Sequence, residues 1–315
     1  MVTLSGWFPA HALLVLLAVA VLAAHATPRE RELQDDGLAL TPFGYWPAAC
    51  VHAAPNGAHV ETTAKGLVRI VHPDGSEHHH QPCASRYSPS RLQELKQHAQ
   101  AKRGQGNGWQ VYTLQQFSNN VTSLLGQWPV PPAPENFDQQ TVFLFTGMQN
   151  INWIPPQPHP GTPFDIIQPV LQYGPSAAGG WDYWAIASWY VTLTDDVVYS
   201  DIQTVQSGDV IFGNMTKVGA DAWYINTVDV TSQINSAITV SRPILATQPW
   251  IYVTLEAYGI YDCSLLPTGT VPFTKLQLTV ERELTTPKWE TGNQNPFCTT
   301  TIKVTDPSTV VIGFQ

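Results

Sequence analysis

The strongest candidate for chemistry is a single carboxylate in an apolar strand. Residues 250–258 read WIYVTLEAY, and strand alternation puts the four aliphatic residues on one face. The other face carries Glu256 together with Tyr252 and Tyr258. Partial burial among these rings would raise the pKa of Glu256 and make it a general base or acid. The alternative is an ordinary solvated residue on an outer strand face.

A carboxamide is the second candidate group. Residues 168–174 read QPVLQYG, which puts Gln168, Val170 and Gln172 on one strand face. Peptide hydrolysis needs a base for water and a donor to the developing oxyanion, and a carboxamide NH2 can supply the second at about 3 kcal/mol. Because Gln172 and Glu256 lie far apart in sequence, their meeting across one cleft would require their two strands to lie side by side.

Four aromatic side chains are expected to line a substrate cleft around this pair. Tyr252 and Tyr258 share the predicted face of Glu256. Trp184 and Tyr190 lie on one face of a predicted strand over residues 183–193, and they line the cleft if that face turns inward.

Other common chemistries lack their residues. Of the eight histidines after Ala26, only His159 lies within residues 109–315, and the chain has no G-x-S-x-G or H-E-x-x-H motif. The triplet at 78–80 favours a surface loop over a metal site, since adjacent strand residues point to opposite faces. We therefore expect no metal and no cofactor.

These residues give the chain a resemblance to the glutamic peptidases of the eqolisin (scytalidoglutamic peptidase-like) family. Short matches follow the family's order over residues 140–282: Phe145-Thr146-Gly147, Leu171-Gln172-Tyr173-Gly174, Trp189-Tyr190, Ser207-Gly208-Asp209-Val210-Ile211, Ile251 through Glu256, and Val271-Pro272-Phe273. The chain looks more distantly like neprosin, in which a Glu stands where Gln172 does. The resemblance implies an acid endopeptidase for peptide or protein substrates, with Glu256 as general base and acid and Gln172 as oxyanion stabiliser.

Three positions depart from the family's pattern. Phe145 stands in place of a Trp, Gln149 in place of an acidic residue, and Ser188 in place of a Glu before the Trp-Tyr pair. They surround the dyad and bear on substrate positioning. Two alternatives therefore stay open: an inactive relative with a structural role, or a secreted jelly-roll lectin or carbohydrate-binding protein, which needs exposed rings but no Gln–Glu pair.

Strands are the elements that must position these groups. Runs rich in aromatic and β-branched residues, separated by Gly, Pro, Asp and Ser, occur at 141–146, 169–173, 183–193, 209–215, 222–230, 250–258, 274–282 and 310–314. Residues 109–315 thus predict an all-β domain, a two-sheet antiparallel β-sandwich of the concanavalin A-like jelly-roll type. A charged fraction of 12% and a net charge of -9 exclude a nucleic-acid binder, which needs a basic footprint.

The sequence before residue 109 has a different character. Residues 1–26 join an apolar run to Ala24-His25-Ala26, which predicts a cleaved signal peptide and a secreted, extracellular protein with no membrane segment afterwards; an uncleaved anchor is the alternative. Residues 27–108 predict a small α+β pro-segment and linker, with a hairpin turn at residues 73–75 and a helix over 88–102 that begins with Ser88 as N-cap.

Charge suggests a role for this pro-segment. Nine basic and eight acidic residues give residues 27–108 a net charge of +1, whereas six basic and sixteen acidic residues give residues 109–315 a net charge of -10. We expect the pro-segment, through its basic run 86–103, to inhibit the acidic unit intramolecularly until acidification. Lys102-Arg103, before a glycine-rich run, predicts a processing site, and an ordinary basic helix end is the alternative.

Cysteines and sequons agree with secretion. The simplest of three connectivities pairs Cys50 with Cys83 and Cys263 with Cys298. Asn120 and Asn214 each begin an N-x-T glycosylation sequon.

Overall fold

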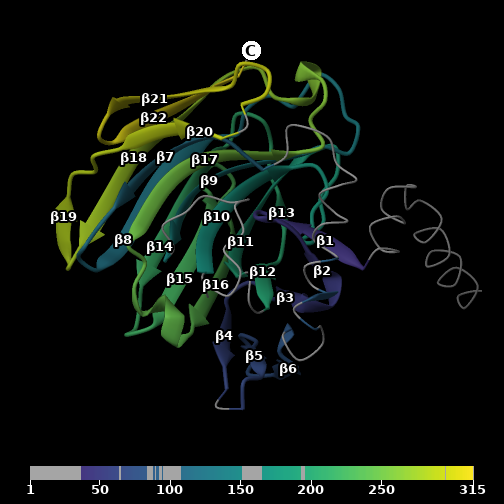
Figure 1. Ribbon diagram of the computed structural model, residues 1–315, viewed down its shortest axis with the longest axis vertical. Coiled ribbons are helices and arrows are strands. Elements are labelled where there is room, and N and C mark those ends of the chain that lie inside the picture. Colours follow the sequence, from purple (N-terminus) through teal and green to yellow (C-terminus); the bar gives the residue numbers. More distant parts are fainter. Residues whose placement is uncertain are drawn as a thin grey trace, which may run out of the picture.

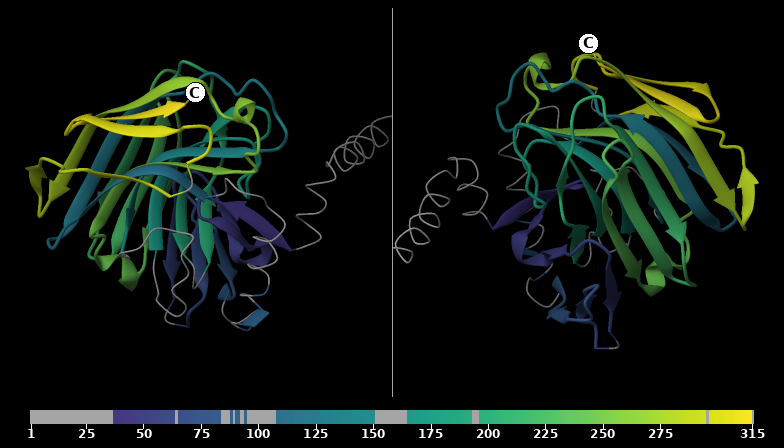
Figure 2. Two further views of the ribbon diagram at one scale, coloured as in Figure 1. Left: turned by 45° about the horizontal axis from the view of Figure 1, so that its top comes forward. Right: turned by 180° about the vertical axis from the view of Figure 1, so that it is seen from behind.

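The computed structural model describes residues 37–63, 65–83, 88, 90, 91, 94, 108–150, 165–192, 196–294 and 296–314. These residues form two large β-sheets and one separate two-stranded hairpin (Figure 1). The two sheets pack face to face, as the views of Figure 2 show, so the predicted all-β sandwich is confirmed.

The first sheet holds the strands of both candidate groups. Its nine strands are, in spatial order, β20 (Glu290–Asn293), β7 (Gly108–Gln116), β17 (Trp250–Tyr258), β9 (Thr141–Gln149), β10 (Asp165–Tyr173), β11 (Trp184–Thr192), β12 (Val197–Ser200) and β3 (Val51–Ala54), with β13 (Gln203–Thr204) paired to β11.

The second sheet has eleven strands. They are, in spatial order, β21 (Thr301–Asp306), β22 (Thr309–Phe314), β18 (Gly269–Val280), β8 (Val121–Pro129), β14 (Val210–Lys217), β15 (Ala222–Asp229), β16 (Ile234–Ser241), β4 (Ala58–Thr62), β5 (Val68–Val71) and β6 (Glu77–His80), with β19 (Glu283–Thr285) paired to β18. The hairpin consists of β1 (Leu38–Thr41) and β2 (Gly44–Pro47), and short 3-10 turns occur at Ala48–Cys50, Pro243–Ala246 and Cys263–Leu265.

All eight predicted strands are present, and several of their ends differ from the predicted ones. The run predicted over 274–282 ends at Val280. Glu281 and Arg282 have φ values of 50° and 73°, which build a two-residue turn into β19. β7, β8 and β16 were not predicted, because their sequences mix Gln, Asn, Ser and Gly among the apolar residues.

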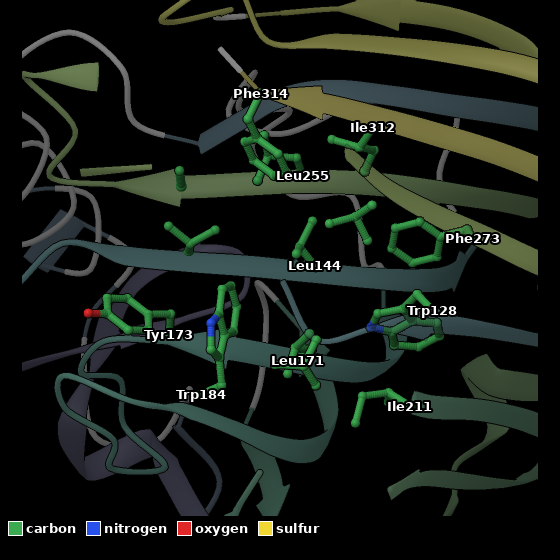
Figure 3. Close-up of a cluster of buried hydrophobic side chains, with 14 of the residues drawn as sticks. Trp128, Leu144, Leu171, Tyr173, Trp184, Ile211, Leu255, Phe273, Ile312 and Phe314 are labelled. Carbon is green, nitrogen blue, oxygen red and sulfur yellow. The ribbon is translucent and has the colours of Figure 1, made fainter. Parts of the chain in front are cut away.

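The main core lies between the two sheets. Figure 3 shows Leu144, Leu171 and Leu255 of the first sheet among Trp128, Ile211 and Phe273 of the second. Pro169 and Gly213 show how closely the sheets approach, since a Cβ added to Gly213 would lie 2.8 Å from the proline ring. Removal of this apolar surface from water is the main source of the free energy that stabilises the sandwich.

The described N-terminal strands extend both sheets. β3 pairs in parallel with β12 at one edge of the first sheet, and β4 pairs in parallel with β16 in the second. The sheets therefore continue across the boundary that the sequence places at residue 108. The hairpin predicted around residues 73–75 is confirmed as β5 and β6, where the Asp74 carboxylate accepts hydrogen bonds from Ser76.

Both predicted disulfides are present. Cys50 is bonded to Cys83 and Cys263 to Cys298, with Cα atoms 5.2 Å and 5.3 Å apart. Of the helix predicted over 88–102, the structure describes Ser88, Ser90, Arg91 and Glu94, and the Ser88 hydroxyl accepts a hydrogen bond from the Arg91 N–H at 3.2 Å, as an N-cap does. The predicted signal peptide and Lys102-Arg103 lie outside the described residues. Within the described ranges, no helix is long and apolar enough to cross a membrane.

Candidate functional site

Gln172 and Glu256 lie in one row across the first sheet. Phe143 of the strand β9 is opposite Gln172 on one side and opposite Glu256 on the other. Directly opposed residues share a face, so both side chains project from the same face. The expectation that their strands lie side by side is wrong, because β9 lies between them. At about 4.8 Å per strand, the two Cα atoms are roughly 10 Å apart, and the Phe143 side chain projects from the same face between them.

Glu256 is a fully buried carboxyl, with an exposed fraction of 0%. The Tyr258 hydroxyl, two residues along the same strand face, donates a hydrogen bond to its Oε1. Burial raises the pKa of Glu256 from 4.5 to about 8, and the Tyr258 hydrogen bond and the nearby Trp109 side chain oppose this rise only in part. The carboxyl is therefore neutral at acidic and neutral pH while it stays buried.

An irregularity in β7 brings Trp109 to this face. The register between β17 and β7 shifts after Leu255, so that Glu256 is opposite Trp109 and Gln110 is left over as a bulge. The Gln110 side chain is used elsewhere, since its amide donates to Gly108 O at 3.1 Å and its Oε1 accepts from Phe297 N at 3.1 Å. The sequence pattern does not predict this place for Trp109, because bulges leave no trace in an alternation of side chains.

Tyr252 and Tyr258 lie on the predicted face. Tyr252 is opposite Gly147 of β9, and a Cβ added to Gly147 would lie 2.2 Å from the tyrosine ring, so only glycine lets the ring cross β9. Burial raises the pKa of Tyr252 well above its ordinary value, and the neighbouring Gln168 side chain opposes this. The Tyr252 ring packs 4.7 Å from that of Trp109, centroid to centroid.

The Gln172 carboxamide is fully engaged by the loop that follows its strand, residues 174–180. Its Nε2 donates to Gly174 O at 3.0 Å and to Gly179 O at 2.9 Å, and its Oε1 accepts from the Ser176 hydroxyl at 2.9 Å. Gly180 must lack a side chain, since an added Cβ would lie 2.6 Å from Nε2. Ser176, which the sequence does not predict as a site residue, thus fixes the orientation of the amide: its hydroxyl holds Oε1, and Nε2 faces the two glycine carbonyls.

Gly174 should tolerate no side chain. Its φ is +91°, which L-residues rarely adopt, and an added Cβ would lie 1.9 Å from the Gln140 carbonyl oxygen. We expect Gly174→Ala to lower the free energy of unfolding by about 3 kcal/mol or more, because backbone strain and overpacking add. Urea unfolding measures this. Gly269→Ala is the matched control, with a φ of +82° and no atom within 4 Å of the added Cβ. Equal losses in the two variants would contradict a steric cause.

The predicted cleft positions of Trp184 and Tyr190 are wrong. Residue 185 is opposite Gln172 in β11, so the face shared with Gln172 carries Ala185, Ala187 and Trp189. Trp184 and Tyr190 project from the other face into the core between the sheets, where Figure 3 shows Trp184 beside Tyr173. Both faces of β11 are buried, so its sequence pattern does not distinguish them.

The β1–β2 hairpin covers the row of the candidate dyad. Leu40 and Trp46 belong to the same buried cluster as Phe143 and Tyr258. Tyr45 packs edge-on against Tyr258, with ring centroids 5.9 Å apart, and Gly44 lies close to the Tyr258 hydroxyl. Three aromatics within residues 43–46 were the available sequence signal for this cover. The predicted open cleft is therefore closed in this structure.

The three departures from the family's pattern have different surroundings. Phe145 lies on the dyad face and packs against Tyr252 at 6.2 Å between centroids, and Gln149 is buried at the end of the same strand. Ser188 lies between the sheets, where its hydroxyl bonds to Thr227 Oγ1 at 2.9 Å and donates to Ser236 O at 2.7 Å. The position of the missing Glu is thus part of a buried hydroxyl network.

The remaining predicted sites are at the surface of the second sheet. Asn120 and Asn214 are both partly exposed, and Thr216 donates to the Asn214 side-chain oxygen at 2.6 Å. Among the residues that the structure describes, no group of three or more His, Cys, Asp or Glu side chains could hold a metal ion.

No protein-family model matches this chain, and no curated protein is significantly similar to it in sequence. Among solved structures, scytalido-glutamic peptidase with a peptide-based transition-state analog is similar at 13% identity and a TM-score of 0.46, over 67% of this chain and 100% of that one. SCP-B, a member of the eqolisin family in complex with the tripeptide Ala-Ile-His, is similar at 12% identity and a TM-score of 0.45, over 67% of this chain and 100% of that one. Aspergilloglutamic peptidase from Aspergillus niger is similar at 13% identity and a TM-score of 0.36, over 56% of this chain and 99% of that one. At these values the similarity concerns the path of the backbone and not the side chains.

Proposed function

We propose that this chain is a secreted acid endopeptidase of the glutamic type. One observation carries the proposal: Gln172 and Glu256 share a row and a face of one sheet, on either side of Phe143. As a carboxylate, Glu256 takes a proton from the attacking water and later delivers it to the leaving amine. The Gln172 NH2 donates a hydrogen bond to the oxyanion of the tetrahedral intermediate.

The covered state is the resting form in this proposal. Both amide hydrogens of Gln172 are used by the carbonyls of Gly174 and Gly179, and the raised pKa keeps Glu256 protonated and unable to accept a proton. Lifting the hairpin admits water, which lowers the pKa of Glu256 towards its ordinary range and restores a base. The Gln172 amide then exchanges one loop carbonyl for the substrate.

We further propose that the segment 27–108 maintains the resting form and yields on acidification. The His52 Nε2 lies 2.7 Å from Asp196 Oδ1, and the Cys83 N–H donates to Asp196 Oδ2 at 3.0 Å, so one buried carboxylate joins two parts of this segment to the start of β12. Protonation of Asp and Glu side chains of the acidic unit below about pH 4 would weaken its attraction to the basic run 86–103. Most of the basic run 86–103, with its cleavage site, lies outside the described residues.

The signal peptide, the disulfides and the sequons belong to the same proposal. Removal of residues 1–26 leaves Thr27 as the first residue of a secreted chain, in which an oxidising compartment suits the two disulfides. Glycans on Asn120 and Asn214 would lie on the second sheet, remote from the dyad.

An assay of the full chain, secreted from a eukaryotic host, tests the proposal. We expect no hydrolysis of a denatured protein substrate at neutral pH, and hydrolysis after acidification that pepstatin does not inhibit. Absence of hydrolysis at every pH, after the segment 27–108 has been cleaved, would overturn the proposal. Sugar binding by the same preparation would then favour the lectin alternative.

Gln172→Ala is expected to leave only a trace of hydrolysis. Loss of an oxyanion donor costs about 100- to 1000-fold in kcat, with a smaller effect on KM, because the donor acts mainly in the transition state. Gln277→Ala, at an exposed position of the second sheet, is the matched control and should retain activity. A Gln172→Ala enzyme with wild-type kcat would remove Gln172 from the mechanism.

A further inference from the structure

The hairpin that covers the dyad is held through two of its backbone carbonyls. The Ala177 N–H donates to Leu40 O at 2.7 Å, and the Gln168 Nε2 donates to Pro42 O at 3.3 Å. These two carbonyls are two residues apart, one in β1 at Leu40 and the other at Pro42 in the turn that follows it. The donors recognise backbone atoms, so they place no demand on the side chains of the segment they hold.

The covering segment presents uncharged, largely apolar side chains. Residues 37–48 read GLALTPFGYWPA and contain no charged residue. Leu38, Leu40 and Trp46 are buried, with exposed fractions of 4%, 4% and 2%. The receiving face is equally apolar, with Phe143, Phe145 and Tyr258 in the same cluster. A charged side chain in place of these residues would have to be desolvated among aromatic rings.

The hairpin belongs to neither large sheet. β1 and β2 pair only with each other in the described structure, in register from Leu38 opposite Pro47 to Thr41 opposite Gly44. An isolated two-stranded hairpin is marginally stable in water, so this one depends on the face that it covers. It can leave that face while β3 and β4 keep their places in the two sheets.

We infer that the face occupied by the hairpin is the substrate groove, that it takes uncharged peptides with apolar and aromatic side chains, and that Gln168 and the Ala177 N–H hold the backbone of such a peptide. This inference rests on the proposed function and names its substrate class. Gln168, Val170 and Gln172 alternate along β10, so Gln168 projects from the dyad face. The peptide it holds therefore runs beside the dyad.

Binding of the peptide GLALTPFGYWPA, labelled with a fluorophore, to the full chain tests the inference. In a Glu256→Gln background, which prevents cleavage of the probe, Trp46→Ala removes the buried indole and loosens the resident hairpin. Fluorescence polarisation should then show at least about tenfold tighter binding than without Trp46→Ala, because a larger fraction of molecules has an open groove. Adding Gln168→Ala should weaken binding about tenfold, as expected for one lost hydrogen bond in an apolar groove, whereas Gln277→Ala should not.

A probe with Asp at the positions of Leu40 and Trp46 should not bind. If Trp46→Ala fails to fold by circular dichroism, Tyr45→Ala provides the same test through its edge contact with Tyr258. Equal binding of the neutral and Asp-containing probes, or no effect of Gln168→Ala, would overturn the inference. If the chain that retains Glu256 binds the peptide but hydrolyses no substrate, this inference stands and the proposed peptidase activity is overturned. If the chain hydrolyses substrate and the peptide does not inhibit it, the peptidase activity stands and this inference is overturned.

Discussion

Replacing Glu256 by Gln is expected to raise the free energy of unfolding by about 3 kcal/mol at neutral pH and to leave it nearly unchanged near pH 4. Burial raises the folded-state pKa of Glu256 from 4.5 to about 8. Between these values the folded chain keeps a proton that the unfolded chain has lost, so the wild-type protein loses stability as pH rises. Glutamine resembles the protonated carboxyl and can still accept the Tyr258 hydrogen bond, but it has no proton to lose.

Urea unfolding of both proteins across this pH range measures the effect. Glu283→Gln is the matched control, since that carboxylate is exposed on β19 and should change stability little. Tyr258→Phe removes the hydrogen bond that opposes the rise in the pKa of Glu256, so this pKa should rise further. The stability of the Tyr258→Phe protein should therefore keep falling with pH up to a higher pH than that of the wild type. A Glu256→Gln protein whose stability parallels the wild type at every pH would show that this carboxyl is not desolvated.

The same substitution is expected to abolish hydrolysis. A carboxamide cannot take the proton of the attacking water, and loss of a general base typically costs on the order of 1000-fold. In a steady-state assay of the acid-activated chain, kcat should fall to background for Glu256→Gln and stay unchanged for Glu283→Gln. Together the two results would separate a catalytic carboxyl, which is costly to the fold and needed for activity, from a structural one.

Undiminished hydrolysis by Glu256→Gln would end the glutamic-peptidase proposal. Its stability effect would still stand, because that effect depends on burial and not on chemistry. Conversely, Glu256→Gln could abolish hydrolysis while its stability varies with pH as that of the wild type does. Glu256 would then remain the base, but its carboxyl would be in contact with water in the resting chain.

Local pattern determined much of the candidate site. Alternation within Trp250–Tyr258 put Tyr252, Glu256 and Tyr258 on one face, because successive side chains of any strand point to opposite sides. The two disulfides also followed from the sequence, since each pair closes a short loop within one region. The eight predicted strands are all present, because β-branched and aromatic runs between Gly and Pro carry a local signal.

Only the tertiary structure decided how these pieces combine. Alternation separates the two faces of β11 but cannot say which one meets the core, and its full burial on both faces removed the hydrophobic contrast that would have excluded Trp184 and Tyr190 from the dyad face. The place of β9 between β10 and β17 is a choice of strand order, which depends on pairings between distant segments. The cover over Glu256 comes from residues more than 200 positions earlier in the chain. It is held by packing and by hydrogen bonds to the carbonyls of Leu40 and Pro42, one from a backbone N–H and one from the Gln168 side chain, and such contacts leave no periodic signal in the sequence.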